Sequence, residues 1–321
     1  MAGKDPIRID DRIFFIDGFD MGLPSRTGTY VLMERDVTLI ETGPSPSVSH
    51  VNRALKQLGI PLEEVRYIIV THIHLDHAGG AGFLLQDCPN DRVIVHPKGA
   101  RHLANPRKLI AGARAVYGER FNDFFEPILP VPGDRMLIKG DGDVLEIGPG
   151  CELEFIDTPG HARHHFRIYD PLSEGMFTGD TAGIRYASLA ERGIEFYLPT
   201  TSPNLFDPKA MRDSLQKFSC LGLRRLYFGH FGMTEKPESA LKMVAFWLDV
   251  FMQEAEAVWS EKVGYDGLAD RIMKRVKAHL ANRGVPADDP VYTIIQPDLQ
   301  ISALGIIDYL QKSRLQQRGL Q

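Results

Sequence analysis

Short apolar runs that end in glycine or polar turns alternate with segments of helical spacing over the first two thirds of the chain. Strands bury continuous or alternating apolar residues, whereas amphipathic helices repeat them every three to four positions. The segments predicted to contain strands are 7–16, 29–32, 37–43, 65–70, 92–97, 136–138, 143–147, 152–157, 166–169, 176–180 and 224–230. The predicted helices are 48–58, 81–85 and 98–125. This alternation predicts an α/β fold.

The pattern becomes purely helical after Pro237. The elements predicted there are helices at 238–262, 266–282 and 300–315, with a loop at 284–290. We therefore expect one domain over residues 1–236 and a helical C-terminal subdomain over residues 237–321. The segment 98–125 is rich in arginine and aromatic residues, and we interpret it as a helical insertion or lid rather than part of a sheet.

Composition and charge are those of an ordinary globular protein, with 43% hydrophobic and 25% charged residues and a formal net charge of −5. An acidic total disfavours nucleic acid as a partner. The first residues lack the apolar core of a signal peptide, and no apolar run approaches the ~18 residues of a membrane span. Three scattered cysteines do not suggest a disulfide framework. We therefore expect a cytoplasmic protein that does not contact membranes.

The densest chemical signal follows the predicted strand 65–70, where His72, His74, Asp76 and His77 fall within six residues. Four ligand-type side chains at the end of a buried strand are hard to explain by packing. Imidazoles and carboxylates bind Zn²⁺, and they also accept iron or manganese. The segment therefore predicts a metal site.

Three more ligand-type residues, His161, Asp180 and His230, end other strand-like runs. Because the ends of neighbouring strands converge on one rim of a layered α/β domain, these residues can join the same site. On an extended segment His72 and His74 point the same way, so they can share one ion with His161. Asp180 can bridge two ions with its two oxygens. The side chains that can share the second ion are Asp76, His77 and His230.

Four motifs therefore follow one another along the chain, namely Thr71-His-Ile-His-Leu-Asp-His77, Gly160-His161, Gly179-Asp180 and Gly229-His230. Their order and spacing resemble those of the metallo-β-lactamase-fold hydrolase superfamily over roughly residues 7–235. The resemblance implies an αββα sandwich with two divalent metal ions, most of all Zn²⁺, at one edge. It also implies that Asp180 bridges them and that Asp76 shuttles a proton. The metal ligands that it implies are His72, His74 and His161 on one ion and Asp76, His77 and His230 on the other.

One position departs from the pattern, because Glu41-Thr-Gly43 stands where many members have Asp-x-Gly. We expect Glu41 to support a ligand rather than to bind metal. Tyr186 lies six residues after Asp180, and it resembles a tyrosine with which some family lactonases bind the substrate carbonyl; a packed aromatic residue is an equal alternative. Arg185 can pair with an anionic substrate. His164 and His165 are expected to support the site, because the ligand set is complete without them.

Ala78-Gly79-Gly80 and the helical C-terminus resemble the lactonase-like and glyoxalase-II-like branches. A bridging hydroxide attacks lactones, esters and thioesters, and phosphoesters as a side activity, so we expect a small-molecule substrate of these classes. The alternative is iron-dependent chemistry on the same fold, with a persulfide or O₂. A decayed, non-catalytic site is disfavoured because no ligand is missing. The apolar stripe Phe246, Trp247, Phe251 and Trp259 can serve a homodimer or the core of the helical region.

Overall fold

A computed structural model describes residues 4–317 and residue 319 of the chain. They form two compact units. Unit 1 comprises the described residues up to Thr158, together with His164–Gly179 and Leu223–Glu235. Unit 2 comprises Pro159–Arg163, Asp180–Gly222 and the described residues from Lys236 onward.

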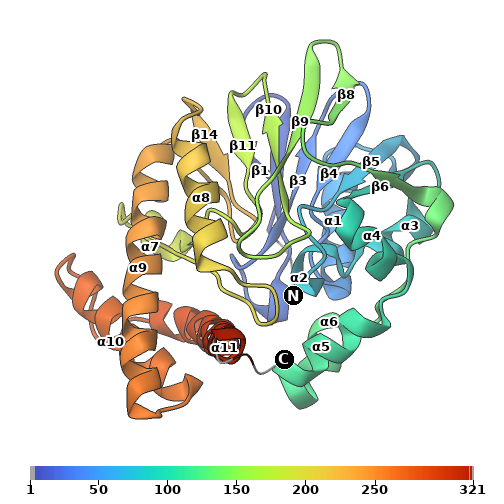
Figure 1. Cartoon of the computed structure of the whole chain (residues 1–321). Coiled ribbons are helices and arrows are strands. Elements are labelled where there is room, and N and C mark those ends of the chain that lie inside the picture. Colours follow the sequence, from blue (N-terminus) through green and yellow to red (C-terminus); the bar gives the residue numbers. More distant parts are fainter. Residues whose placement is uncertain (1–3, 318, 320–321) are drawn as a thin grey trace. The chain divides into compact units, whose positions relative to one another are not determined.

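Unit 1 contains a seven-stranded sheet whose strands follow chain order (Figure 1). Its strands are β1 (Ile7–Arg8), β2 (Ile13–Asp17), β3 (Gly28–Leu32), β4 (Val37–Ile40), β5 (Val65–Ile69), β6 (Arg92–Val95) and β7 (Met136–Ile138). The first four strands are antiparallel neighbours. From β4 to β7 the neighbours are parallel, with helices in the connections. Parallel strands need such crossovers, and the carboxyl ends of β4, β5 and β6 therefore share one edge.

A second sheet of unit 1 has six strands in the order β15-β14-β11-β10-β9-β8. They are β8 (Val144–Gly148), β9 (Cys151–Asp157), β10 (Phe166–Asp170), β11 (Gly175–Phe177), β14 (Arg225–Tyr227) and β15 (Met233–Thr234). The strands β11 and β14 are parallel, and the other neighbours are antiparallel. The mixed sheets and the helical C-terminal region confirm the predicted α/β class.

Aromatic side chains join the inner faces of the two sheets. Tyr30 on β3 lies 5.1 Å from Phe177 on β11 and 5.6 Å from Tyr227 on β14, measured between ring centroids. Its hydroxyl donates to the carbonyl of Phe228 at 2.8 Å. A buried phenol needs such a partner, so this bond orients the ring within the interface between the sheets.

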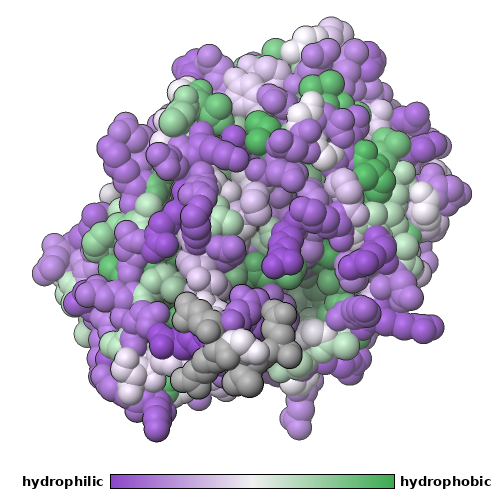
Figure 2. Space-filling view, in the orientation of Figure 1, coloured by the Kyte–Doolittle hydropathy of each residue, from purple (hydrophilic) through white to green (hydrophobic). Residues whose placement is uncertain are grey.

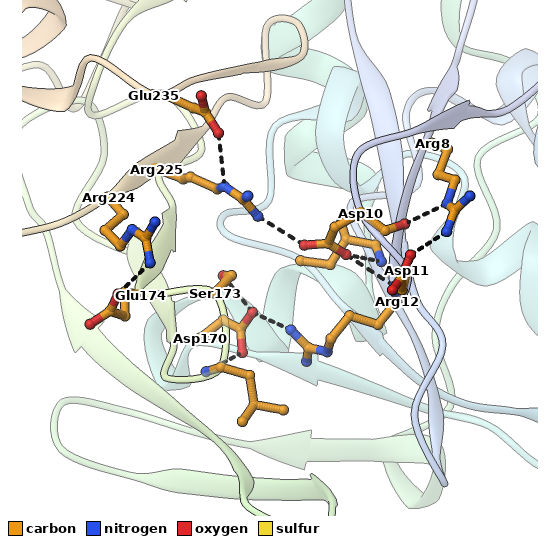
Figure 3. Close-up of polar contacts among 12 residues, drawn as sticks. Arg8, Asp10, Asp11, Arg12, Asp170, Ser173, Glu174, Arg224, Arg225 and Glu235 are labelled. Carbon is orange, nitrogen blue, oxygen red and sulfur yellow. Dashed lines mark hydrogen bonds and ion pairs between the residues drawn. The ribbon is translucent and has the colours of Figure 1, made fainter.

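Charged side chains connect the sheets at a second place, drawn in Figure 3. Arg12, just before β2, donates to Asp170 at the end of β10 at 2.6 Å, and Asp170 also accepts from Ser173 at 2.6 Å. Arg225 on β14 donates to Asp10 at 2.9 Å. The Asp170 side chain has no exposed area, so its charge requires these donors. Asp170 is the last residue of β10, whereas His165 directly precedes its first residue. The two side chains therefore lie at opposite ends of the strand.

The helices of unit 1 lie in the connections between strands. They are α1 (Val48–Gln57), α2 (Leu75–Ala78), α3 (Ala81–Asp87), α4 (Pro97–Ala104), α5 (Arg107–Tyr117) and α6 (Phe121–Phe125), with short 3₁₀ turns at Asp20–Gly22, Ser45–Ser47, Leu62–Glu64, Gly118–Arg120 and Gly133–Arg135. The apolar face of α1 places Val51 and Leu55 in the same buried cluster as Leu39 and Ile68 of the first sheet. The helical interpretation of 98–125 is confirmed, with breaks next to Pro106 and at Gly118.

Unit 2 is mainly helical. Its elements are β12 (Ile184–Arg185), α7 (Ala187–Ala190), β13 (Tyr197–Leu198), α8 (Pro208–Ser219), α9 (Pro237–Glu261), α10 (Tyr265–Ala281) and α11 (Val291–Gln317). Trp247 and Phe251 are buried, whereas Phe246 is 55% exposed. The apolar stripe of α9 thus contributes mainly to a packed core, and a homodimer stays a prediction.

Two predicted boundaries were wrong. The expected strand 7–16 is two strands, because the Asp10 carboxylate accepts from the backbone N–H groups of Arg12 and Ile13 and holds a turn between them. The expected helix 300–315 begins at Val291 and continues through Pro297. A proline removes one helical hydrogen bond and usually marks a helix start, which explains the wrong prediction.

Hydrophilic residues cover much of the face drawn in Figure 2, with smaller hydrophobic areas between them. Over residues 4–317, no helix combines the length and apolar character needed to span a lipid bilayer.

Candidate metal centre

The motif at residues 71–77 owes its shape to a change of backbone conformation at His74. The buried strand β5 leads into Thr71 and His72, and His74 keeps an extended backbone with φ −64° and ψ 150°. The helix α2 then begins, and the N–H groups of His77 and Ala78 donate to the His74 carbonyl at 3.1 and 2.8 Å. An extended stretch followed at once by a helical turn gathers four ligand-type side chains in one place.

Within unit 1, three of the predicted ligands converge on one point. The Nε2 atoms of His77 and His230 lie 3.3 Å apart. Asp76 Oδ2 lies 3.6 Å from the first and 3.4 Å from the second. Bonds of ~2.0–2.1 Å in a tetrahedral zinc site separate neighbouring ligand atoms by ~3.3–3.4 Å. The three atoms therefore have the spacing of one triangular face of such a site, and the donor set fits a divalent ion.

Glycines allow these ligands to approach the backbone. A Cβ atom on Gly229 would lie 2.6 Å from Cε1 and 3.1 Å from Nδ1 of His77. A Cβ atom on Gly179 would lie 2.5 Å from Nε2 of His165, and Gly179 also has a φ of +47°. The distances of 2.6 and 2.5 Å are shorter than real Cβ atoms show. The glycines that precede His230 and Asp180 are thus required by space, and at Gly179 also by conformation.

Glu41 supports a ligand from the opposite side. Its Oε1 lies 3.4 Å from Nδ1 of His77 and accepts from the Thr71 hydroxyl, while Oε2 accepts from the Thr71 N–H at 3.3 Å. Because Nε2 of His77 faces Asp76 and His230, Glu41 holds the ring rather than competing for the ion. Glu41, His72 and His77 also form a group close enough to hold a metal. We favour the supporting role, which agrees with the sequence prediction. Glu41 adopts a φ of +67°, which is unusual for a residue with a side chain.

Another pair of imidazoles meets in unit 1. His72 Nε2 and His74 Nδ1 lie 3.0 Å apart, and Nδ1 of His72 lies 3.1 Å from the Thr71 hydroxyl. His164 and His165 are buried beside them, with ring centroids 6.4 and 5.0 Å from that of His72. His165 Nδ1 bonds with the Thr158 hydroxyl at 2.8 Å, which suits the supporting role predicted for it.

The last two predicted ligands, His161 and Asp180, are close neighbours in unit 2. His161 Nε2 lies 3.3 Å from Asp180 Oδ2 and 3.2 Å from the Ser202 hydroxyl. The other ring nitrogen of His161, Nδ1, lies 3.1 Å from the Thr200 carbonyl, so it carries the proton and leaves Nε2 as an electron-pair donor. Both side chains are buried. Their geometry is again that of paired metal ligands.

The two residues suggested as substrate contacts also lie in unit 2. The Tyr186 hydroxyl donates to Asp298 Oδ2 at 3.1 Å, and both residues are buried. Arg185 Nε lies 3.9 Å from Glu195 Oε2. Each side chain thus has an acidic partner within its own unit.

The sequence pattern did not predict a buried ion pair that lies near the metal ligands of unit 1. Asp20 Oδ2 lies 3.7 Å from Arg26 Nε, and both side chains are under 5% exposed. Burial raises the pKa of Asp20 to about 6; Arg26 opposes the rise, and the nearby Asp76 adds to it. Neither carboxylate oxygen of Asp20 accepts a hydrogen bond from a described residue. No motif surrounds this aspartate, so nothing in the local pattern marks it.

Other histidines have structural contacts. His96 precedes α4 and caps its start, because its Nδ1 accepts from the Lys98 N–H at 3.0 Å. Its Nε2 lies 3.1 Å from Asp157 Oδ1. The His279 ring packs 5.6 Å from Phe196 and 5.4 Å from Trp247. Both histidines therefore contribute to the structure of their own units.

Several proteins with different names are similar in sequence to parts of this chain. A metallo-β-lactamase fold-containing protein of Sulfurisphaera tokodaii is 27% identical over 65% of this chain and 74% of its own length. A hydroxyacylglutathione hydrolase of Albidiferax ferrireducens is 29% identical over 50% of this chain and 49% of its own length. Diflavin flavoprotein A 1 of Synechocystis is 27% identical over 56% of this chain, which spans only 28% of that protein.

A solved structure extends the likeness to the whole fold. The metallo-β-lactamase family protein of Thermus thermophilus matches with a TM-score of 0.67 over 95% of each chain, at 20% identity. The family model of the metallo-β-lactamase superfamily matches residues 26–230, which hold all seven predicted ligands. The chain belongs to the metallo-β-lactamase superfamily.

Proposed function

We propose that the protein is a metal-dependent hydrolase that cleaves a thioester, ester or lactone bond, with phosphoester cleavage as a side activity. The observation that carries the proposal is the triangle formed by Asp76, His77 and His230, whose atoms have the spacing of a metal-binding face. The relative named hydroxyacylglutathione hydrolase supports acyl chemistry. The proposed cofactors are two divalent ions, with zinc first and iron or manganese as alternatives.

The proposed ligand sets follow the family pattern. In that pattern His72, His74 and His161 would hold one ion, Asp76, His77 and His230 would hold the other, and Asp180 would be a ligand of both. When bound, two such ions supply a hydroxide at neutral pH and polarise the bond under attack. The residues of this chain keep the site ordered, because Glu41 fixes the orientation of His77 and the Thr200 carbonyl fixes that of His161.

Asp76 is the proposed proton carrier. Its side chain is 21% exposed, whereas those of His77 and His230 are 0% and 8% exposed. A carboxylate that binds with one oxygen and meets solvent with the other can take a proton from the attacking water and pass it to the leaving group. The more buried imidazoles are less able to exchange protons with solvent.

Tyr186 enters the proposal with a weaker role. Its hydroxyl already donates to Asp298, so donation to a substrate carbonyl requires that bond to break. This contact favours a role in packing over a role in catalysis.

The test combines metal counting with substrate screening. We expect about two zinc or manganese ions per purified chain, and hydrolysis of acyl-glutathione thioesters, aryl esters or lactones. Asp180→Asn should lower the metal content and abolish hydrolysis, because a carboxamide is a weak bridging ligand. Two retained ions and full activity in that variant would contradict the assignment of Asp180.

The likeness to a diflavin flavoprotein favours a second candidate, iron-dependent oxygen chemistry. His74 argues against the O₂-reducing branch, which typically carries a glutamate at that position. The persulfide branch works with one iron on two histidines and one aspartate, whereas all seven ligand residues are present here. One iron per chain together with O₂ consumption in the presence of a persulfide would replace the hydrolase proposal.

A further inference from the structure

The helices α4 to α6 of unit 1 carry a charge opposite in sign to that of the rest of the chain. Residues 97–126 contain six lysine and arginine residues and three acidic residues, although the whole chain has a net charge of −5. All six cations are exposed, namely Lys98, Arg101, Arg107, Lys108, Arg114 and Arg120. We call this set the basic face. It forms a local positive patch on an acidic protein.

Helix stability does not explain the cations at the start of α5. The helix α5 contains no fully buried residue, and its apolar contribution comes from half-buried residues that pack against the cluster of α6, namely Leu109, Ile110, Ala113 and Tyr117. Arg107 and Lys108 occupy its first turn, where no acidic residue is present. Cations are unfavourable there because the helix N-terminus is itself positive. Arg107 and Arg114 lie two turns apart on one side of α5, separated by ~10 Å along its axis.

The basic face lies beside the metal ligands of unit 1. Phe121, Phe124 and Phe125 of α6 form one buried apolar cluster with Leu75, and Met21 and Tyr117 pack against this cluster. Leu75 stands between His74 and Asp76 in the chain. A molecule bound to α4 and α5 is therefore anchored, through α6, next to the loop that carries the ligands.

We propose that the basic face docks an acidic carrier protein that presents the substrate as a thioester. This inference rests on the proposed acyl hydrolase function and names its substrate class. The cations are spread over α4, α5 and the turn that follows, and across ~10 Å of α5 alone, which suits a protein surface better than a single phosphate group. Leu109, Ile110 and Tyr117 lie among them and pack in part against the apolar cluster of α6, so only the uncovered part of each side chain adds apolar area to such an interface.

Two features favour a protein over a nucleic acid. Acidic residues are interspersed with the cations, and Glu126 already pairs with Arg114 at 3.2 Å. The aromatic rings of α6 are buried, and the guanidinium groups of Arg114 and Arg120 cover Phe121 and Phe124 at 4.5 and 4.4 Å. These rings are therefore closed to the base stacking that nucleic-acid surfaces use.

The test compares one acyl group on two carriers. The probes are an acidic acyl carrier protein loaded with an octanoyl thioester, and octanoyl-N-acetylcysteamine, which has the same thioester without the protein. The variant is Arg107→Glu/Lys108→Glu/Arg114→Glu. Its matched control is Lys56→Glu/Arg66→Glu/Arg92→Glu, three exposed cations on α1, β5 and β6 whose reversal changes the net charge equally. For each protein we measure the ratio of kcat/KM on the carrier-linked thioester to that on the small thioester.

We expect the wild-type ratio to fall at least about tenfold in the basic-face variant and less than about twofold in the control. Raising the salt concentration from about 50 to about 500 mM should lower the wild-type ratio in the same direction. Equal ratios in the wild type and the basic-face variant would overturn the docking proposal.

A binding measurement separates this proposal from the proposed function. The unloaded carrier protein is titrated against the wild-type protein and both variants, with no need for turnover. Binding that only the basic-face variant loses supports docking, even if neither thioester is hydrolysed and the hydrolase proposal fails. Absence of binding to the wild type overturns it. Tighter binding of a single-stranded RNA, lost in the same variant, would overturn it in favour of a nucleic-acid surface.

Discussion

Gly229→Ala is expected to disable one metal position through a single added methyl group. The new Cβ would lie 2.6 Å from Cε1 of His77, against an ordinary contact distance of about 3.5 Å. The His77 ring or the loop must therefore move by about 0.9 Å, whereas metal–ligand distances tolerate only about 0.2 Å. Glu41 Oε1 contacts Nδ1 of the same ring at 3.4 Å, so a movement of the ring also disturbs that contact.

A misplacement of about 1 Å at a reacting centre costs on the order of 100-fold in rate. We therefore expect hydrolysis to fall by about that factor, with about one metal ion lost per chain. Elemental analysis and kcat measurements on the zinc-loaded protein test this. Gly133→Ala is the matched control, because its Cβ would meet nothing within 4 Å and its φ is not in the left-handed region. Full metal content in Gly229→Ala, with activity within twofold of the control, would refute the argument.

Three further predictions concern pH, a hydroxyl group and the metal. The raised pKa of Asp20 means that the folded protein binds more protons than the unfolded chain between pH 4 and 6, so stability falls as pH rises through this window, by up to about 3 kcal/mol. Asp20→Asn should abolish this part of the slope in urea unfolding of the metal-free protein at several pH values, and an unchanged slope would exclude Asp20 as its source. Tyr186→Phe should cost about 1–3 kcal/mol of stability by removing one hydrogen bond to the buried Asp298; a large fall in kcat/KM with unchanged thermal stability would instead assign Tyr186 to catalysis. Chelation with EDTA should lower the Tm, and zinc should restore it, because the ion stabilises only the folded donor set; an EDTA-insensitive Tm in a protein shown to have lost its metal would contradict this.

Local patterns were enough to predict the α/β class and most strands, because strand and helix spacing depend on which residues must be buried. The motif at 71–77 could also be predicted, since its ligands lie within six residues and follow an apolar run. The helix α8 was missed, although Asp207 before Pro208 is a helix-start signal, and its side chain does accept from the N–H groups of Lys209 and Ala210.

The sequence by itself determined which residues can bind metal, because ligand chemistry belongs to residue type and order. Only the tertiary structure decided which atoms meet. The contact of Glu41 with His77, the burial of Asp20 with Arg26, and the space that requires Gly229 all join positions far apart in the chain or leave no local pattern. Such contacts arise when separate strand ends pack against one another. Such contacts cannot be predicted from residue type, because the energy of each contact depends on both partners.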